Sequence, residues 1–203
     1  MRARQQQGWF EVIAGTRAVA VRRDDPADVA AATKCFGFVQ RVDQKPKRRL
    51  FELLTAQGMR ANQQITFLSD GGESLRAVQE LLHPHAEYVL DWFHVTMRLT
   101  VMGQYAKGLP TTAPPPVTVE DEDEDEPVAM VMRAEAERQL ESITWSLWHG
   151  NVLDALEAID VLTGQTDAAA ETDAAAKKLT KALSEFRGYI DNNQGAIPND
   201  GER

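Results

Sequence analysis

The chain lacks the features that stabilise secreted proteins and anchor membrane proteins. Its 203 residues include one cysteine, Cys35, so no disulfide can form within the chain. A reducing, cytoplasmic location is therefore expected, with Cys35 acting as a small apolar residue in a strand. No segment approaches the roughly 20 consecutive apolar residues of a membrane-spanning helix. The first ten residues carry basic side chains without an apolar stretch behind them, so neither a secretory signal nor a membrane partner is expected.

The common catalytic signatures are also missing. The sequence contains no Walker loop, no dinucleotide-binding glycine pattern, no nucleophile elbow and no zinc-type cluster. His83, His85 and His149 have no partner at a metal-site spacing. With these signatures missing, the catalytic chemistry that remains is metal chemistry based on carboxylates.

Charge is spread unevenly, so the net charge of −9 describes neither half of the chain. Residues 1–108 carry 15 Lys and Arg against 11 Asp and Glu, a net of +4. Residues 109–203 carry 7 against 20, a net of −13, and seven of these acids form one run, Glu120 to Glu126. A mildly basic first half suits a polyanionic partner such as DNA, whereas the acidic second half does not.

Residues 1–108 alternate between strand-like and helix-like patterns in the order β-β-β-α-β-α-β-α. The first two strands are predicted to form a hairpin that turns at Gly15. This order predicts an α/β fold with a mixed sheet and helices on its faces. The predicted strands cover residues 9–15, 16–23, 34–42, 65–68 and 87–93, and the predicted helices cover residues 46–59, 72–82 and 94–106.

The rest of the chain is predicted to contain helices but no strands. Residues 109–127 combine prolines with the acid run, which predicts an extended linker. Apolar stripes at helical spacing then predict a helical region over residues 128–191, and turn-forming residues predict an irregular tail over residues 192–203. Trp145 and Trp148 are expected to anchor the packing between the first two of these helices.

Two acids come at the ends of predicted strands. Asp70 follows one apolar run and Asp91 ends the next, so in a parallel arrangement both lie at the same edge of the sheet. Carboxylates gathered there can hold Mg²⁺, which also takes water and phosphate oxygens as ligands. Gly71 and Gly72 are expected to leave room for a phosphate backbone beside Asp70.

The same residues also fit purely structural roles. Ser69 and Asp70 are favoured helix N-caps, and Glu73 is placed to complete a capping box. Asp91 can face solvent, and His94 can pack beneath the helix that follows it. From spacing alone, both interpretations stay open.

Several separate blocks resemble one family of enzymes. These blocks are KCFGFVQ, KPKRRLFELL, FLSDGGESLRAVQELL, LDWFHVTMRLTVMGQ, LWHGN and YIDNNQGAIP. In this order they are similar to bacterial insertion-sequence transposases of the Kra-type group, which are distantly similar to Mutator-like enzymes. The resemblance covers nearly the whole chain apart from residues 109–127.

The resemblance implies a ribonuclease-H-like fold with a DDE triad of acids, which cuts and joins DNA at transposon ends with Mg²⁺ or Mn²⁺. Asp70 matches the second acid of the triad, which implies a catalytic and metal-binding role for it. The LDWFH block, Asp91 to His94, matches a family motif outside the triad. The expected fold is therefore a partial ribonuclease-H-like mixed sheet with flanking helices over residues 1–108, followed after the linker by a helical insertion over residues 128–191.

Two acids of the triad have no counterpart here. In the family the first aspartate lies just upstream of the segment resembling residues 2–15, and the last glutamate lies beyond the segment resembling residues 196–203. Asp24 and Asp25 do not substitute, because they lie in a predicted turn. The family's usual N-terminal DNA-binding region also has no counterpart. The chain is therefore expected to be a transposase fragment, truncated at both ends, with poor metal binding and no strand transfer of its own.

Two other hypotheses remain open. The chain can be a non-catalytic regulatory remnant that associates with full-length transposase or with itself, or that binds DNA weakly. Alternatively, without a central strand it can fail to fold stably, because a sheet edge is left exposed. Seven basic residues are candidates for the weak DNA contacts: Arg17, Arg22, Arg23, Lys45, Lys47, Arg48 and Arg49.

Overall fold

The computed structural model describes residues 12–17, 34–39, 46–56, 58–111, 133–199 and 201. Over these residues the fold is mixed α/β and mostly helical, with two small sheets. The elements are β1 (Val12–Arg17), β2 (Lys34–Val39), α2 (Pro46–Ala56), β3 (Thr66–Ser69), α3 (Glu73–Leu82), β4 (Glu87–Leu90), α4 (Trp92–Ala106), α5 (Arg133–Trp148), α6 (Val152–Ala169), α7 (Ala174–Asn193) and the short 3-10 helix η1 (Gln194–Ala196). None of the described helices is both long and apolar enough to cross a membrane.

The chain divides into two compact units at places that differ from the predicted boundary at Gly108. One unit comprises residues 1–65 and 73–86, and the other comprises residues 66–72 and 87–203. The helix α4, which was expected to belong with the sheet, packs instead on α5 and α7. Its buried side chains, Val95, Leu99, Met102 and Ala106, form one apolar stripe, and such a stripe can cover a sheet or a helix equally well.

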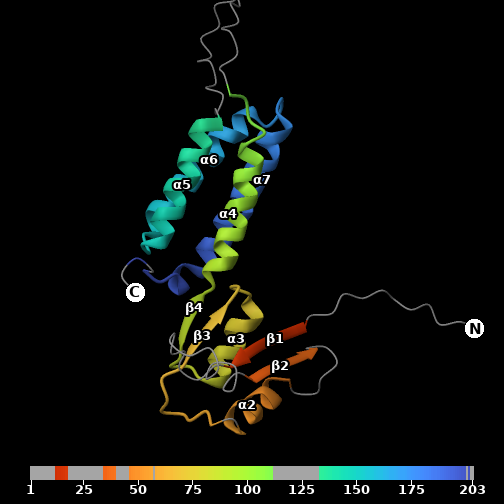
Figure 1. Cartoon of the computed structure of the whole chain (residues 1–203), viewed down its shortest axis with the longest axis vertical. Helices are drawn as coiled ribbons and strands as arrows, with labels where there is room; N and C mark the ends of the chain where they lie inside the picture. The colour runs from red at the N-terminus through yellow and green to blue at the C-terminus, as the bar shows by residue number, and fades with distance from the viewer. Residues whose placement is uncertain are drawn as a thin grey trace, which may run out of the picture. The chain divides into compact units, whose positions relative to one another are not determined.

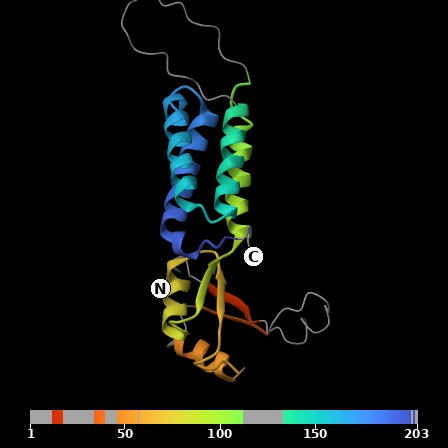
Figure 2. The same cartoon turned by 90° about the vertical axis from the view of Figure 1, so that its left-hand side faces the viewer.

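The second unit contains a four-helix bundle. Helices α4, α5, α6 and α7 lie side by side, and each packs against two of the others (Figures 1 and 2). The helices predicted for the second half are confirmed, since the stripes on α5, α6 and α7 all face the core. The largest side chains of this core with almost no exposure include Met102, Ile143, Leu147, Ile159, Leu162, Leu179, Leu183, Phe186 and Ile190.

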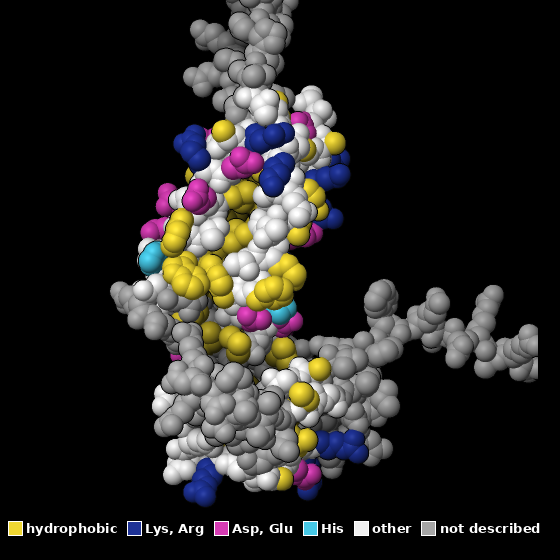
Figure 3. All heavy atoms as spheres, viewed as in Figure 1, with side chains coloured by type: hydrophobic (Ala, Val, Ile, Leu, Met, Phe, Trp, Pro, Cys, Tyr) yellow, Lys and Arg dark blue, Asp and Glu magenta, His cyan; other side chains and the backbone are white. Residues whose placement is uncertain are grey.

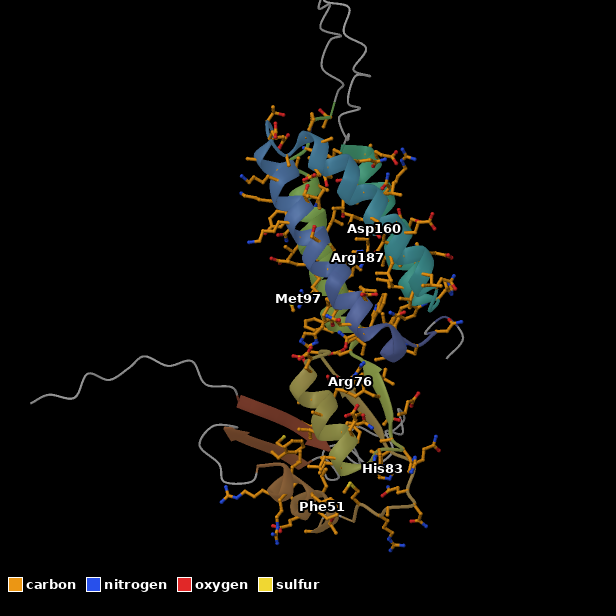
Figure 4. All side chains as sticks on the ribbon, turned by 180° about the vertical axis from the view of Figure 1, so that it is seen from behind. Phe51, Arg76, His83, Met97, Asp160 and Arg187 are labelled. Carbon is orange, nitrogen blue, oxygen red and sulfur yellow. The ribbon has the colours of Figure 1, made fainter. Side chains whose placement is uncertain are left out.

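Polar side chains also join neighbouring helices of the bundle. The buried Thr166 of α6 accepts a hydrogen bond from the Thr180 hydroxyl of α7 at 2.9 Å. On the bundle surface, Arg187 of α7 donates to Asp160 of α6 at 2.7 Å, and Figure 4 shows these two side chains on adjacent helices. The exposed pair contributes little to stability, whereas the partly buried hydroxyl pair helps to fix how α6 and α7 are aligned.

The connection between α4 and α5 begins and ends at one place on the bundle. Leu109, at the start of the predicted linker, is buried in the core. The backbone N–H of Arg133 donates to the carbonyl oxygen of Pro110 at 3.0 Å. The acid run and the rest of the predicted linker, residues 112–127, lie outside the described residues.

Trp145 is not a core residue, contrary to the prediction. It is 57% exposed and stacks on His149, with ring centroids 5.9 Å apart. Trp148 instead packs edge-on against Trp92 of α4, with ring centroids 5.1 Å apart. The helical period explains the difference, because Trp145 lies two residues from Ile143 and so on the opposite face from the buried stripe of α5.

The predicted irregular tail begins later than expected. Helix α7 continues to Asn193, and η1 follows it over Gln194–Ala196, so regular structure extends past residue 192. Beyond η1, the backbone N–H of Gly201 donates to the carbonyl of Trp148 at 3.2 Å. The described part of the tail is therefore held against the end of α5.

In the first unit, β1 runs straight through Gly15, so the predicted hairpin turn at that residue is wrong. Strand β1 pairs antiparallel with β2, and Gly15 lies opposite Phe36. A Cβ placed on Gly15 would lie 2.6 Å from the Phe36 ring, which explains a glycine inside a strand. Residues 18–23 of the predicted hairpin lie outside the described residues.

The described strands form two separate pairs rather than the single mixed sheet that was predicted. β1 and β2 are antiparallel, and β3 and β4 are parallel. Helices α2 and α3 contact one another and bury four aliphatic side chains, Leu50, Leu54, Val78 and Leu82. At the end of α3 the ring of His83 is buried and lies 3.1 Å from the carbonyl of Ala61.

Candidate functional site

The two acids singled out in the sequence follow directly on a pair of parallel strands. In the β3–β4 register Ser69 pairs with Leu90, so Asp70 and Asp91 come next on their strands. The backbone N–H of Asp91 donates to the carbonyl of Ser69 at 2.7 Å. The prediction that both acids lie at the carboxyl edge of parallel strands is confirmed.

Asp91 uses both of its carboxylate oxygens within the chain. It is the N-cap of α4, where Oδ1 accepts a hydrogen bond from the Phe93 N–H at 3.0 Å. Its Oδ2 pairs with Nδ1 of His94 at 2.9 Å. Asp91 therefore starts α4 and orients His94, and each of its oxygens already has one partner within the chain.

Asp70 has a more open carboxylate. The side chain is exposed, and Oδ1 accepts a hydrogen bond from the Gly72 N–H at 3.2 Å. Within the described part of the chain Oδ2 has no hydrogen-bond partner. The predicted capping box does not form, because α3 begins at Glu73 and so places that residue in the first helical position instead of the third.

The turn after β3 is closed by the chain itself. Gly71 has a φ of +86°, and a Cβ there would lie 2.8 Å from Leu90 and 2.9 Å from the side-chain amide of Asn193. Its N–H donates to the Ser69 hydroxyl at 3.0 Å, and that hydroxyl lies 2.6 Å from the hydroxyl of Tyr88. The space beside Gly71, expected to receive a phosphate backbone, is filled by Leu90 and Asn193.

Helix α7 supplies contacts to this turn that sequence reasoning missed. The Tyr189 hydroxyl donates to the backbone carbonyl of Asp70 at 3.0 Å, across 119 residues of sequence. The guanidinium of Arg98 lies 4.2 Å from the centroid of the Tyr189 ring. The buried Asn193 donates to the carbonyl of Tyr189 at 2.9 Å. The block YIDNNQGAIP was visible in the sequence, but nothing in its spacing links it to Asp70.

The surroundings of Tyr189 favour its protonated form. Burial raises the pKa of Tyr189 above its ordinary value of 10.0, and the charges of Asp70 and Asp91 raise it further, against the opposing effect of Arg98. A phenolate could not donate to the Asp70 carbonyl and would face two carboxylates. The hydroxyl therefore stays a donor to Asp70 well above neutral pH.

This pKa shift predicts how stability depends on pH. Because folding raises the pKa of Tyr189, its protonated hydroxyl stabilises the folded state fully below about pH 10. This contribution is lost as the pH rises through the raised pKa. Urea unfolding of wild type and Tyr189→Phe at about pH 8 and about pH 11 tests this. The stability difference between the two proteins should shrink at the higher pH, because the variant has lost the titrating group. A difference that does not change with pH would contradict the prediction.

Beyond the turn, aromatic side chains are exposed on the bundle. Phe93 is 63% exposed and contacts the ring of His94, with ring centroids 5.7 Å apart. Figure 3 shows apolar side chains at the surface of the lower half of the bundle. The large apolar side chains that are exposed on α4, α5 and α6 are Phe93, Met97, Val101, Trp145, Leu153 and Val161.

The described residues do not form a complete metal centre. Within them, no three His, Cys, Asp or Glu side chains come together as a group that could hold an ion. Of the seven basic residues expected to meet DNA, only Arg48 and Arg49 have described side chains, and both are exposed on α2. Arg48 forms an ion pair with Glu52 of the same helix at 2.8 Å.

No protein-family model, curated protein or solved structure matches this chain. The similarity to Kra-type transposases therefore stays a prediction that depends on the sequence blocks given above. The geometry adds one exposed carboxylate, that of Asp70, on a turn that β4 and α7 hold in place.

Proposed function

We propose that this chain is part of the catalytic core of a DDE transposase of the Kra-type group, with Asp70 as one of the three acids that hold divalent metal ions. One observation carries the proposal. Asp70 directly follows a parallel strand, is exposed and keeps one carboxylate oxygen without a partner in the described residues. The carboxyl end of parallel strands is where ligands collect in α/β sheets.

The arrangement of elements supports a ribonuclease-H-like interpretation. A parallel pair needs a crossover connection, and α3 lies between β3 and β4 in the chain. Three helices, α5 to α7, follow the segment rich in proline and acids, as expected of a helical insertion. These helices form a bundle with α4, and α7 of this bundle contacts the turn that carries Asp70.

The two acids at this edge, Asp70 and Asp91, differ in how well they can bind a metal ion. Asp70 offers a free hard oxygen, which is the ligand type that Mg²⁺ and Mn²⁺ prefer. Asp91 offers less, because each of its two oxygens already has a partner, Phe93 or His94. The bound ions would activate the attacking oxygen and stabilise the leaving one. The two remaining acids of the triad have no counterpart among the 203 residues, so the chain supplies one ligand of three.

A metal titration tests the role of Asp70 directly. Mn²⁺ bound at Asp70 should broaden the amide NMR signals of Gly71 and Gly72 first, because it is paramagnetic and close to them. Asp70→Asn should remove this local broadening, since an amide is a weaker ligand for a hard cation. The matched control is Asp154→Asn, which changes another exposed acid, in the first turn of α6. Equal broadening in wild type and Asp70→Asn would overturn the proposed metal role.

An activity assay tests the prediction that the chain alone is inactive. Purified protein with Mg²⁺ or Mn²⁺ and DNA carrying transposon ends is expected to give neither nicks nor joined products, because one carboxylate cannot hold two ions. Metal-dependent cleavage that Asp70→Ala abolishes would contradict this prediction. A steep fall of DNA affinity with salt, without cleavage, would instead favour the regulatory remnant that binds DNA.

The genomic DNA around the coding sequence tests the family. We expect an aspartate at the end of a strand-like segment, followed by glycines, to be encoded upstream in the same frame. A helix-like segment with a glutamate is expected downstream. If neither segment is encoded nearby, the chain is not part of an intact DDE core.

A further inference from the structure

We infer that Tyr189 is a positioning residue, which fixes the backbone of Asp70 and makes α7 a working part of the metal site. This inference depends on the proposed role of Asp70 as a metal ligand. The hydroxyl of Tyr189 reaches the carbonyl oxygen of the residue that carries the carboxylate, at 3.0 Å. No assigned step of the proposed function requires this contact.

The turn needs such a constraint because of its composition. Asp70 is followed by two glycines, which lack a Cβ and give the free chain many backbone conformations. A metal ligand has to hold its oxygen within about 0.5 Å of the productive position. The hydrogen bond from Tyr189 restricts the peptide group between Asp70 and Gly71 at its carbonyl end. The N–H of the same peptide group donates a hydrogen bond to the Ser69 hydroxyl.

Several residues of α4 and α7 hold Tyr189 in place. Asn193, one turn along α7, donates to the carbonyl of Tyr189, and its side-chain amide also covers Gly71. Arg98 of α4 lies over the tyrosine ring, and the ring of Phe186 lies near it in a roughly parallel orientation, with centroids 6.3 Å apart. Residues from α4 and α7 therefore hold the hydroxyl in a fixed position relative to the turn.

A purely packing role for Tyr189 makes a different prediction. If only the ring matters, Tyr189→Phe keeps every ring contact and leaves the turn unchanged. If the hydroxyl positions Asp70, the same variant frees the Asp70 carbonyl while the bundle stays folded. A single hydrogen bond is worth about 0.5–1.5 kcal/mol, so the local effect should be about two- to tenfold.

The experiment compares wild type, Tyr189→Phe and Tyr105→Phe by NMR on the full chain. Tyr105 is a matched control, because it is also partly buried and its hydroxyl makes no hydrogen bond within the described residues. In Tyr189→Phe we expect a shifted carbonyl carbon signal for Asp70 and amide exchange at Gly71 faster by about two- to tenfold. The apparent Kd for Mn²⁺ at Asp70 should rise by a similar factor. Tyr105→Phe should change none of these.

The outcomes separate this inference from the proposed function. An unchanged Asp70 carbonyl signal and unchanged exchange in Tyr189→Phe overturn the positioning role, whatever the metal result. Changes of equal size at Gly164, far along α6, also overturn it, because they would indicate general loosening of the bundle. If wild type shows no Mn²⁺ broadening near Asp70, the metal role fails, while the carbonyl and exchange signals still decide the positioning role.

Discussion

Replacing Phe186 by alanine is expected to lower the free energy of unfolding of the bundle by about 3–5 kcal/mol. Phe186 is 1% exposed and is the largest fully buried side chain among the described residues, so its removal leaves a cavity that the surrounding helices can fill only in part. Because its ring also lies beside that of Tyr189, the loss should extend to the turn that carries Asp70. Urea unfolding monitored by circular dichroism measures the change as a lower midpoint with an unchanged slope.

The matched control for this prediction is the same substitution at a surface position. Phe93 lies on α4 and is 63% exposed, so Phe93→Ala should change stability by less than about 1 kcal/mol. Both variants lose the same ring, and only its burial differs. Equal losses in the two variants would show that Phe186 does not lie in the cooperative core.

Gly71→Ala is expected to destabilise the second unit by about 2–5 kcal/mol. Part of this loss is backbone strain, because a φ of +86° is unfavourable for alanine by about 1–2 kcal/mol. The rest is steric, since the new methyl group would lie within 3 Å of Leu90 and Asn193, and overpacking costs about 1–3 kcal/mol. Thermal or urea unfolding measures the loss, and the Gly72 amide signal should move with it.

Two further variants make the Gly71 prediction sharper. Gly188→Ala, on α7 with nothing near its Cβ position, should stabilise the helix by about 0.5–1 kcal/mol. Asn193→Ala in the Gly71→Ala background should cost less than it does alone, because it also relieves the clash. Strictly additive losses, or a neutral Gly71→Ala, would contradict the tight contact between the turn and α7.

The parts of the fold that the sequence predicts well depend on short-range periodicity. The stripe Leu179, Leu183, Phe186 and Ile190 recurs at nearly helical spacing, and these residues face the core of the bundle. The placement of Asp70 and Asp91 follows from two apolar runs and the geometry of parallel strands. In both cases the responsible residues lie close together in the chain.

The errors come from residues whose role depends on distant partners. Gly15 looks like a turn residue, yet it lies inside a strand because the ring of Phe36 occupies the space of a side chain. Trp145 looks like a core residue because of its size, although the helical phase of α5 places it outside. The two compact units divide elsewhere than at Gly108, because α4 packs on α5 and α7.

The candidate site could be predicted only in part for the same reason. One exposed acid at a strand end is a local feature, whereas its support comes from Tyr189 and Asn193, more than 100 residues away. No periodicity or spacing connects them, since the contact forms only when α7 packs beside α4. The sequence therefore indicates the exposed acid at the strand end and not the residues that hold it in place.

The hydrogen bond between Pro110 and Arg133 has a consequence for how this chain can change over generations. It closes the α4–α5 connection at its base, so the fold requires only that the intervening residues bridge two neighbouring points. The entropy cost of such a bridge grows slowly with its length, by about 0.6 kcal/mol for each doubling. Insertions, deletions and changes of charge between these two residues should therefore accumulate almost freely, and the same place suits the insertion of an affinity tag or a fluorescent reporter.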